Sequence, residues 1–200
     1  MLFIVSGASG VGKSTLCTML MQQFDTLGPS VSYTTRPPRG AEIDGDHYHF
    51  VDHPAFEEIV AAGGFAEYAE VHGNYYGTTV ATIDAALSVG RSVLFDIDYQ
   101  GSRSLKRRYP EAVTVMVLPP SFDVLEQRLR CRGTDAPDVV SRRLIAARHE
   151  IAQARDFEYL VVNDDIDDAY QKIQSIYAAG HQRTERVLPF VREAMGLRSE

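Results

Sequence analysis

The segment that decides the fold of this chain is Gly7-Ala8-Ser9-Gly10-Val11-Gly12-Lys13-Ser14, which matches the pattern G-x-x-x-x-G-K-S/T in full. A short apolar run at residues 2–5 precedes it, and residues 14–24 place apolar side chains at helical spacing after it. A strand, a glycine-rich loop and a helix in this order are the context that supports a phosphate-binding loop. We therefore predict a P-loop at the start of a three-layer α/β core with a parallel sheet, the P-loop NTPase arrangement.

Each part of this loop has a chemical role toward a nucleoside triphosphate. Glycines let successive backbone N–H groups point at phosphate oxygens, and the following helix adds its positive N-terminal end. Lys13 is expected to reach the β- and γ-phosphates of ATP, and Ser14 is expected to ligate Mg²⁺. The alternative is a glycine-rich turn that only closes a strand-to-helix corner. The loop residues predicted to bind ATP are Gly7, Ala8, Ser9, Gly10, Val11, Gly12, Lys13 and Ser14.

Beyond the loop, apolar strands alternate with helical patterns. Residues 92–97 and 112–118 are predicted to be buried strands, each preceded by a helix, and residues 159–162 a last strand. This alternation is typical of an α/β sandwich. The predicted helices lie near residues 80–89, 102–108 and 168–179, and the predicted core comprises residues 1–30, 81–120 and 156–182.

Residues 31–80 depart from the core pattern. Ser, Thr, Arg, Pro and Tyr accumulate there, with strand-like pieces at 47–51 and 65–71 around a predicted helix at 54–62. We predict a small mixed α/β insertion rather than a continuation of the parallel sheet.

Residues 121–155 carry seven arginines on two predicted helices that are separated near residues 133–137. A charged helical hairpin with little apolar surface is expected to act as a mobile lid. The chain ends in a predicted helical tail at 183–200, of which the sequence suggests only a packing role.

Composition excludes several classes of function. The 20 Lys and Arg residues against 27 Asp and Glu give a formal charge of −7, which argues against broad binding to nucleic acid or to an anionic membrane. Cys17 and Cys131 stand alone, so neither a disulfide framework nor a zinc site is predicted. The N-terminal apolar run is too short for a secretory signal and lacks a basic start, so a cytoplasmic location is expected. No obligate protein partner is inferred.

A second anion site is indicated between Ser30 and Gly40. Arg36 and Arg39 lie three residues apart on a proline-stiffened segment with flanking hydroxyls. Planar guanidinium groups suit a phosphate dianion, so this segment is expected to hold a second phosphate-bearing molecule.

This stretch closely resembles the substrate segment of the guanylate kinase family. The resemblance covers nearly the whole chain, from about Leu2 to about His181, with the motifs in family order. It implies one domain over residues 1–182, in which 31–80 bind GMP and 121–155 form the lid. The motifs that carry it are Glu42, Gly45, Tyr48-His49-Phe50-Val51, Glu67, Gly73-Asn74-Tyr75-Tyr76-Gly77-Thr78, Asp96-Ile97-Asp98-Tyr99-Gln100-Gly101, Arg132-Gly133-Thr134 and Val162-Asn163-Asp164-Asp165.

The resemblance implies Mg-dependent transfer of a phosphoryl group from ATP to GMP, and to dGMP as well. An ionised Glu67 fits this substrate, because the Watson–Crick edge of guanine presents adjacent donors and a carboxylate offers only acceptors. Such hydrogen bonds can discriminate between bases by factors of roughly 10⁴ to 10⁵. Each of these residues also has an alternative role without GMP. The arginines could be solvated surface charges, the tyrosines could pack within strands, and Glu67 could be an exposed carboxylate. The residues implied to bind GMP are Ser32, Arg36, Arg39, Tyr48, Glu67, Tyr76, Thr78, Asp96 and Asp98.

The resemblance also implies which residues act on the transferring group. Lys13 and Mg²⁺ cover the donor side, and lid arginines arrive as the lid closes. Capping the following loop is a competing role for Asp98, and a solvated helix charge is a competing role for Arg148. Asn163 is placed near the adenine of ATP, with an N-cap or turn role as the alternative. The implied catalytic residues are Lys13, Arg132, Arg143 and Arg148.

Two rival functions differ in what they need from the sequence. A peptide-binding module of the same fold typically lacks an intact P-loop, whereas Gly12, Lys13 and Ser14 are all present here. A kinase acting on a phosphorylated ribose has no guanine edge that would use Glu67.

Overall fold

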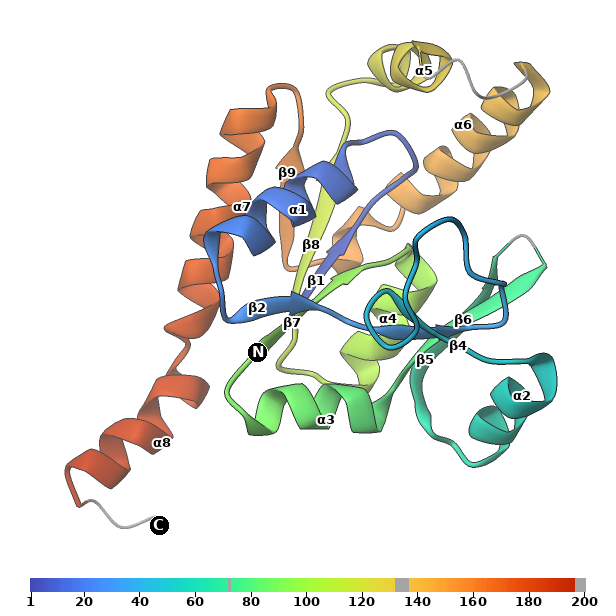
Figure 1. Cartoon of the computed structure of the whole chain (residues 1–200). Helices are drawn as coiled ribbons and strands as arrows, with labels where there is room; N and C mark the ends of the chain where they lie inside the picture. Colours follow the sequence, from blue (N-terminus) through green and yellow to red (C-terminus); the bar gives the residue numbers. More distant parts are fainter. Residues whose placement is uncertain (72, 132–136, 197–200) are drawn as a thin grey trace.

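The computed structural model, which describes residues 1–71, 73–131 and 137–196, has a central parallel sheet with helices on both faces (Figure 1). Within those residues this sheet has five strands in the order β2–β7–β1–β8–β9, and each neighbouring pair is parallel. The carboxyl ends of parallel strands meet at one edge, where open α/β sheets bind ligands. The strands are β1 (Leu2–Ser6), β2 (Leu27–Pro29), β7 (Ser92–Asp96), β8 (Val113–Leu118) and β9 (Tyr159–Val162).

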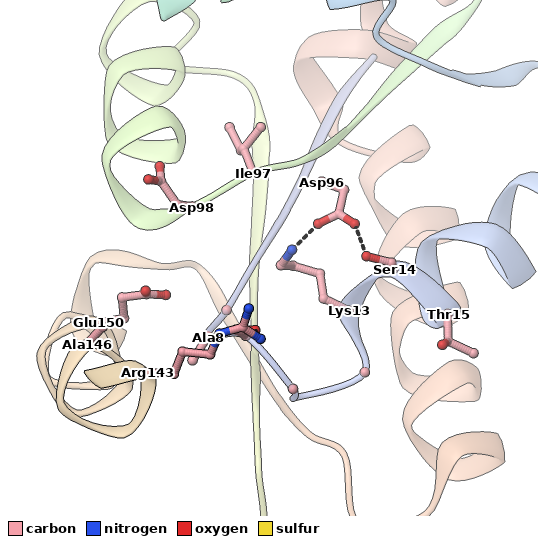
Figure 2. Close-up of a pocket in the computed structure, with 14 residues that line it drawn as sticks. Ala8, Lys13, Ser14, Thr15, Asp96, Ile97, Asp98, Arg143, Ala146 and Glu150 are labelled. Atoms are coloured by element: carbon pink, nitrogen blue, oxygen red, sulfur yellow. Dashed lines mark hydrogen bonds and ion pairs between the residues drawn. The ribbon is translucent and has the colours of Figure 1, made fainter. Parts of the chain in front are cut away.

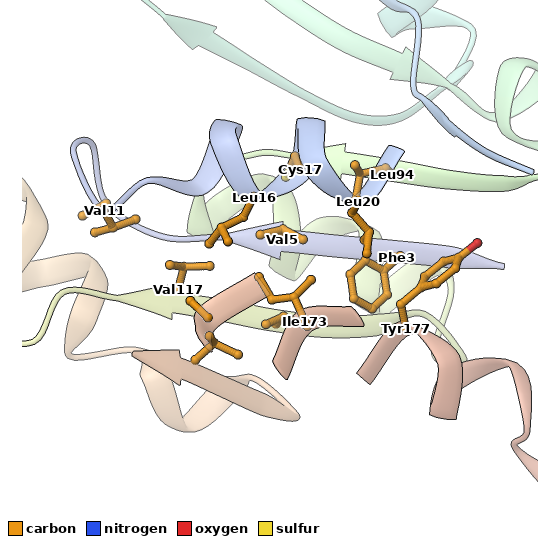
Figure 3. Close-up of a cluster of buried hydrophobic side chains, with 14 of the residues drawn as sticks. Phe3, Val5, Val11, Leu16, Cys17, Leu20, Leu94, Val117, Ile173 and Tyr177 are labelled. Atoms are coloured by element: carbon orange, nitrogen blue, oxygen red, sulfur yellow. The ribbon is translucent and has the colours of Figure 1, made fainter. Parts of the chain in front are cut away.

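The buried strand β1 supplies side chains to hydrophobic clusters on both faces of this sheet. Phe3 and Val5 pack with α1 (Lys13–Gln23) and α7 (Ile166–His181), as Figure 3 shows. Leu2 and Ile4 pack on the opposite face, against α3 (Val80–Ser88) and α4 (Tyr99–Arg108). Alternate residues of a strand point to opposite faces, so a run of apolar residues makes a strand that is buried on both sides. The predicted three-layer α/β core is confirmed.

A second, mixed sheet forms within residues 31–80. Its order is β4–β3–β6–β5, with β3 parallel to β4 and the other neighbours antiparallel. Phe56 of α2 stacks on Phe65 at 4.4 Å and on Tyr75 at 5.3 Å, which gives the insertion an aromatic core of its own. The elements are β3 (Ser32–Thr34), β4 (Tyr48–Phe50), α2 (His53–Ala61), β5 (Phe65–Val71) and β6 (Asn74–Thr79).

The helical hairpin of α5 (Phe122–Cys131) and α6 (Pro137–Ile151) buries more apolar surface than predicted. Leu125 and Leu129 of α5 are fully buried, and they belong to the same cluster as the P-loop side chain Val11. Val140 and Ala147 of α6 join that cluster. The expectation of little apolar surface is therefore wrong, because the apolar residues recur at helical spacing between the arginines and face the core.

Short elements are where the sequence-based prediction and the structure differ. Strands β2, β3 and β6 were not predicted, and α4 begins at Tyr99 rather than near Ser102 because Asp98 caps it. The tail contains α8 (Thr184–Ala194), as predicted, and the 3₁₀ turn Ala154–Asp156 precedes β9. None of the helices in the described part of the chain has the length and apolar character that crossing a bilayer requires.

Candidate nucleotide-binding site

The P-loop connects β1 to α1 at the carboxyl edge of the central sheet. Gly12 has φ +91°, and a Cβ there would lie 2.3 Å from Nδ2 of Asn163. That amide nitrogen donates a 2.7 Å hydrogen bond to the carbonyl of Val11, and Asn163 is only 4% exposed. Asn163 therefore ties the loop after β9 to the P-loop, and only glycine fits between them. Its alternative role as an N-cap is wrong, since Asp165 caps α7.

Helix α5 supports the P-loop from the other side. A Cβ at Gly10, where φ is +93°, would lie 2.9 Å from a methyl carbon of Leu129 and 3.2 Å from one of Leu125. Arg128 donates to the carbonyl of Asn163 at 2.9 Å. Sequence analysis did not single out Leu125 or Leu129, although their i, i+4 spacing was a signal, and it counted Arg128 only among the seven arginines of the hairpin.

Lys13, Ser14 and Asp96 form one hydrogen-bonded group, shown in Figure 2. Asp96 ends β7, the strand beside β1, so the parallel register brings its carboxylate to the P-loop. The ammonium group of Lys13 forms an ion pair with Asp96, and the Ser14 hydroxyl donates to the other carboxylate oxygen at 2.6 Å. The group combines a lysine for phosphate with two oxygen ligands for a cation.

The donor set of this group fits Mg²⁺. Mg²⁺ prefers oxygen ligands and keeps several waters, and it is commonly bound by one or two protein oxygens together with phosphates. The Ser14 hydroxyl and the Asp96 carboxylate offer such oxygens at the N-terminus of α1. The described residues contain no group of three or more His, Cys, Asp or Glu side chains that could hold a metal ion.

A pocket of about 520 Å³ opens over the P-loop between Asp96 to Asp98 and α6. Arg143, Ala146 and Glu150 line it from α6 at positions i, i+3 and i+7, so one stripe of the helix faces the loop (Figure 2). Burial raises the pKa of Glu150, and the Asp98 carboxylate raises it further. Glu150 was missed by sequence reasoning, although it lies two helical turns after Arg143.

Two of the three predicted lid arginines, Arg143 and Arg148, lie in different surroundings. Arg143 reaches the loop, with Nη1 at 3.4 Å from the Ser9 hydroxyl. Arg148 does not line the pocket, because its guanidinium lies 4.2 Å from the ring centre of Phe122 on α5. From Arg143 to Arg148 the helix turns by about 140°, so the two arginines do not share one face of α6. A position of Arg148 beside Arg143, which its implied role in catalysis would favour, is not seen here. Arg132 lies outside the described residues.

Ser32, Glu67 and Thr78 come together on the second sheet. Glu67 Oε1 accepts the backbone N–H of Thr78 at 3.0 Å, and the hydroxyls of Thr78 and Ser32 are 3.0 Å apart. A bulge between Phe65 and Glu67 turns Ala66 into the core, and Glu67 itself is 8% exposed. Burial raises the pKa of Glu67 to about 7.

Asp98 links this cluster to the pocket. It caps α4 by accepting the N–H of Gly101 at 2.8 Å, so the competing capping role is confirmed. A Cβ at Gly101 would lie 3.4 Å from Asp98 Oδ1 and 3.5 Å from Glu67 Oε2. Glycine at this position therefore keeps open the space between the two carboxylates.

Arg36, Tyr48 and Tyr76, three of the residues predicted to bind the phosphate of GMP, lie close together. Arg36 is 6% exposed, and its guanidinium lies 5.4 Å from the ring centre of Tyr48. The rings of Tyr48 and Tyr76 are 6.0 Å apart and meet edge to face. Arg36 forms an ion pair with Glu42, whereas Arg39 is exposed.

Known proteins match this chain over all of the residues described for the site. A family model described as guanylate kinase matches residues 1–179. A guanylate kinase of Neisseria gonorrhoeae is 46% identical over 97% of this chain and 95% of its own, and one of Geobacter metallireducens is 45% identical over 96% and 95%. The crystal structure of guanylate kinase from Anaplasma phagocytophilum matches with a TM-score of 0.73 and 29% identity, over 100% of this chain and 96% of that chain.

Proposed function

We propose that this chain, which belongs to the guanylate kinase family and phosphorylates GMP with ATP as the donor, divides the reaction between the two clusters of its site. The P-loop cluster takes the triphosphate of ATP, and the second sheet takes GMP. The observation that carries this division is the placement of Glu67, which is buried beside Asp98 at the edge that the P-loop also occupies.

On the donor side, Lys13 and the backbone N–H groups of residues 7–14 bind the phosphates of ATP. Ion pairing with Asp96 holds the Lys13 ammonium group at the mouth of the loop. Ser14 and Asp96 would hold Mg²⁺, which supplies charge neutralisation on the phosphate oxygens when bound. Asn163 acts on ATP through the loop, since its amide fixes the carbonyl of Val11.

On the acceptor side, Arg36, Arg39, Tyr48 and Tyr76 bind the phosphate of GMP. Guanidinium groups and phenolic hydroxyls donate hydrogen bonds to phosphate oxygens, and the buried Arg36 does so in an environment of reduced solvent screening. Alignment of this phosphate with ATP is the main catalytic requirement, because the GMP phosphate is itself the nucleophile.

Ser32, Glu67 and Thr78 recognise the base. The carboxylate accepts the N1–H and the exocyclic amine of guanine, and the hydroxyls beside it complete the polar surface. Asp96 and Asp98, which line the pocket over the P-loop, complete the proposed GMP site on the side of the reaction centre. Because most of these contacts concern the base and the phosphate, we expect dGMP to be accepted as well.

Arginines of the α5–α6 hairpin stabilise the transferring group and exclude water as the lid closes. Arg143 supports this role, because its guanidinium already reaches the P-loop hydroxyl of Ser9. The same role is proposed for Arg132 and Arg148. We also propose that the protein acts in the cytoplasm, where both nucleotides are available.

The proposal is tested by measuring ADP release from ATP with GMP, dGMP, AMP, UMP, CMP and ribose phosphates side by side. We expect GMP and dGMP to be used, and Glu67→Gln to lose most of its GMP kinase activity while ATP binding remains, because one acceptor oxygen becomes a donor. The matched control is Glu70→Gln, which makes the same change at an exposed position of the same strand and should behave like the parent. Equal ADP release with ribose phosphates would favour the sugar-phosphate kinase, and GMP binding without turnover would favour the binding module.

A further inference from the structure

Glu42 is the acidic side chain that contacts both arginines of the phosphate site. Its two carboxylate oxygens accept from Nη1 of Arg36 at 3.0 Å and from Nη2 at 2.9 Å. Oε2 also accepts the backbone N–H of Arg39 at 2.7 Å. The backbone N–H of Glu42 donates to the Arg39 carbonyl at 3.1 Å, which closes a turn that contains Gly40 at φ +57°. One residue therefore fixes the guanidinium group of Arg36 and the backbone of Arg39.

The donor groups of Arg36 show what this pairing leaves available. A guanidinium has five N–H donors in a rigid fork. Glu42 takes one from each Nη, and the carbonyl of Pro37 takes the second one of Nη1 at 2.7 Å. The two remaining donors lie on Nε and Nη2, which together form the other bidentate edge of the fork. Tyr76, another predicted phosphate ligand, adds to the effect of Glu42 in raising the pKa of this guanidinium.

The surroundings of Arg36 oppose any other orientation. The side chain is 6% exposed, and the rings of Tyr48 and Phe50 lie 5.4 and 5.8 Å from its guanidinium carbon. The pKa of Glu42 is lowered mainly by its hydrogen bonds from Arg36, and to a smaller extent by the hydrogen bond from the Arg39 backbone. Its carboxylate therefore stays ionised at neutral pH. The ion pair with Glu42 and the two aromatic rings thus shield the guanidinium of Arg36 from solvent and fix its orientation.

We propose that Glu42 is a positioning residue for GMP: its carboxylate holds Arg36 so that the Nε–Nη2 edge is presented to the phosphate of GMP. This inference rests on the proposed role of Arg36 in binding that phosphate. It differs from a competing arrangement in which the carboxylate occupies the fork in place of the phosphate. Positioning predicts weaker GMP binding when Glu42 is replaced, whereas competition predicts tighter binding.

The experiment measures kcat and the KM values for GMP and for ATP in Glu42→Gln, Glu42→Ala and Arg36→Lys, and in the double variant Arg36→Lys/Glu42→Ala. Glu42→Gln keeps the size of the side chain, so it decides the result if Glu42→Ala does not fold. We expect the KM for GMP to rise roughly tenfold or more in each Glu42 variant, with kcat and the KM for ATP within about threefold of the parent. In the double variant the KM for GMP should be no higher than in Arg36→Lys, because a lysine has no fork to orient.

The control is Glu57→Gln, which removes a charge at an exposed position of α2 in the same insertion. An unchanged or lower KM for GMP in the Glu42 variants, or effects that add in the double variant, would overturn the positioning role. If Arg36→Lys itself leaves the KM for GMP unchanged, the proposed role of Arg36 fails instead.

Discussion

At the scale of single residues, Glu67 shows how a fold changes the chemistry of a common side chain. Within the second sheet it is 8% exposed, and burial raises its pKa to about 7. Hydrogen bonds from Thr78 act in the opposite direction, because they favour the ionised form. The carboxyl group therefore changes its protonation state close to neutral pH, and guanine should shift this equilibrium.

GMP binding is expected to strengthen as the pH is raised through about 7. Guanine presents donors to Glu67, so it binds the ionised carboxylate, and a protonated carboxyl places a donor against a donor. Since the unliganded pKa is about 7, the dissociation constant for GMP should fall by roughly fivefold between pH 6 and pH 7. Calorimetry in buffers of different ionisation enthalpy would measure this change and the proton released on binding.

The phosphate of GMP also titrates in this range, near a pKa of about 6. Glu67→Gln retains that titration and lacks the carboxyl, so the difference between the two proteins isolates Glu67. A pH dependence that is the same in both would show that Glu67 does not supply the acceptor.

At the scale of elements, α5 is both a part of the charged hairpin and a support of the P-loop. Its fully buried side chains Leu125 and Leu129 lie against Gly10, and its Arg128 binds the loop that follows β9. Helix α6 presents Arg143 and Glu150 to the pocket. For the proposed lid closure we therefore expect α6 to move more than α5.

Leu129→Ala is expected to lower the free energy of unfolding by about 2 to 5 kcal/mol, because it leaves a cavity beneath the P-loop. Urea unfolding followed by circular dichroism measures this change. Leu188→Ala on α8 is the matched control: that side chain is 38% exposed, so the same substitution should cost less than about 1 kcal/mol. Equal losses for both variants would contradict the buried contact of α5 with the loop.

The elements differ in how well the sequence predicts them. Strand β1 and helix α1 were predicted, because the apolar run and the glycine-rich loop mark their ends. Strands β2 and β3 have three residues each, too few for a period to be recognised, and they exist because neighbouring strands pair with them. Strand β6, with Asn74, Gly77 and two tyrosines, resembles a turn-rich segment until its pairing with β5 is known.

At the scale of the whole molecule, α8 stands apart from the functional parts. Helix α8 buries no residue, and Phe190 and Met195 are 72% and 70% exposed. Figure 1 shows it at the end of the molecule far from the P-loop. The start of α8 is held by hydrogen bonds from Arg183 and Arg186 to the carbonyl of Glu111. The family match ends at residue 179, before this helix begins.

Ending the chain after Arg186 should leave the kinase intact. None of the deleted residues that the structure describes, 187–196, belongs to either hydrophobic cluster. We therefore expect kcat and both KM values within about twofold of the full chain, and a free energy of unfolding within about 1 kcal/mol of it. Steady-state kinetics and urea unfolding of the two proteins provide the comparison. A large loss of GMP kinase activity would show that the tail acts on the site.

The sequence by itself determined the P-loop, the α/β class and the segment that carries Arg36, because glycine geometry, apolar period and charge are local properties of the chain. Only the tertiary structure decided that Asn163 buttresses the P-loop, that a bulge directs Glu67, that Arg148 faces Phe122 and that Glu42 holds Arg36. The Asn163 contact joins segments far apart in sequence, the bulge exists because β5 pairs with β6, and Arg148 meets Phe122 because α5 packs against α6. The contact of Glu42 with Arg36 depends on how a turn folds back on itself. Local patterns predict which side chains are available, whereas packing sets their direction, partners and pKa.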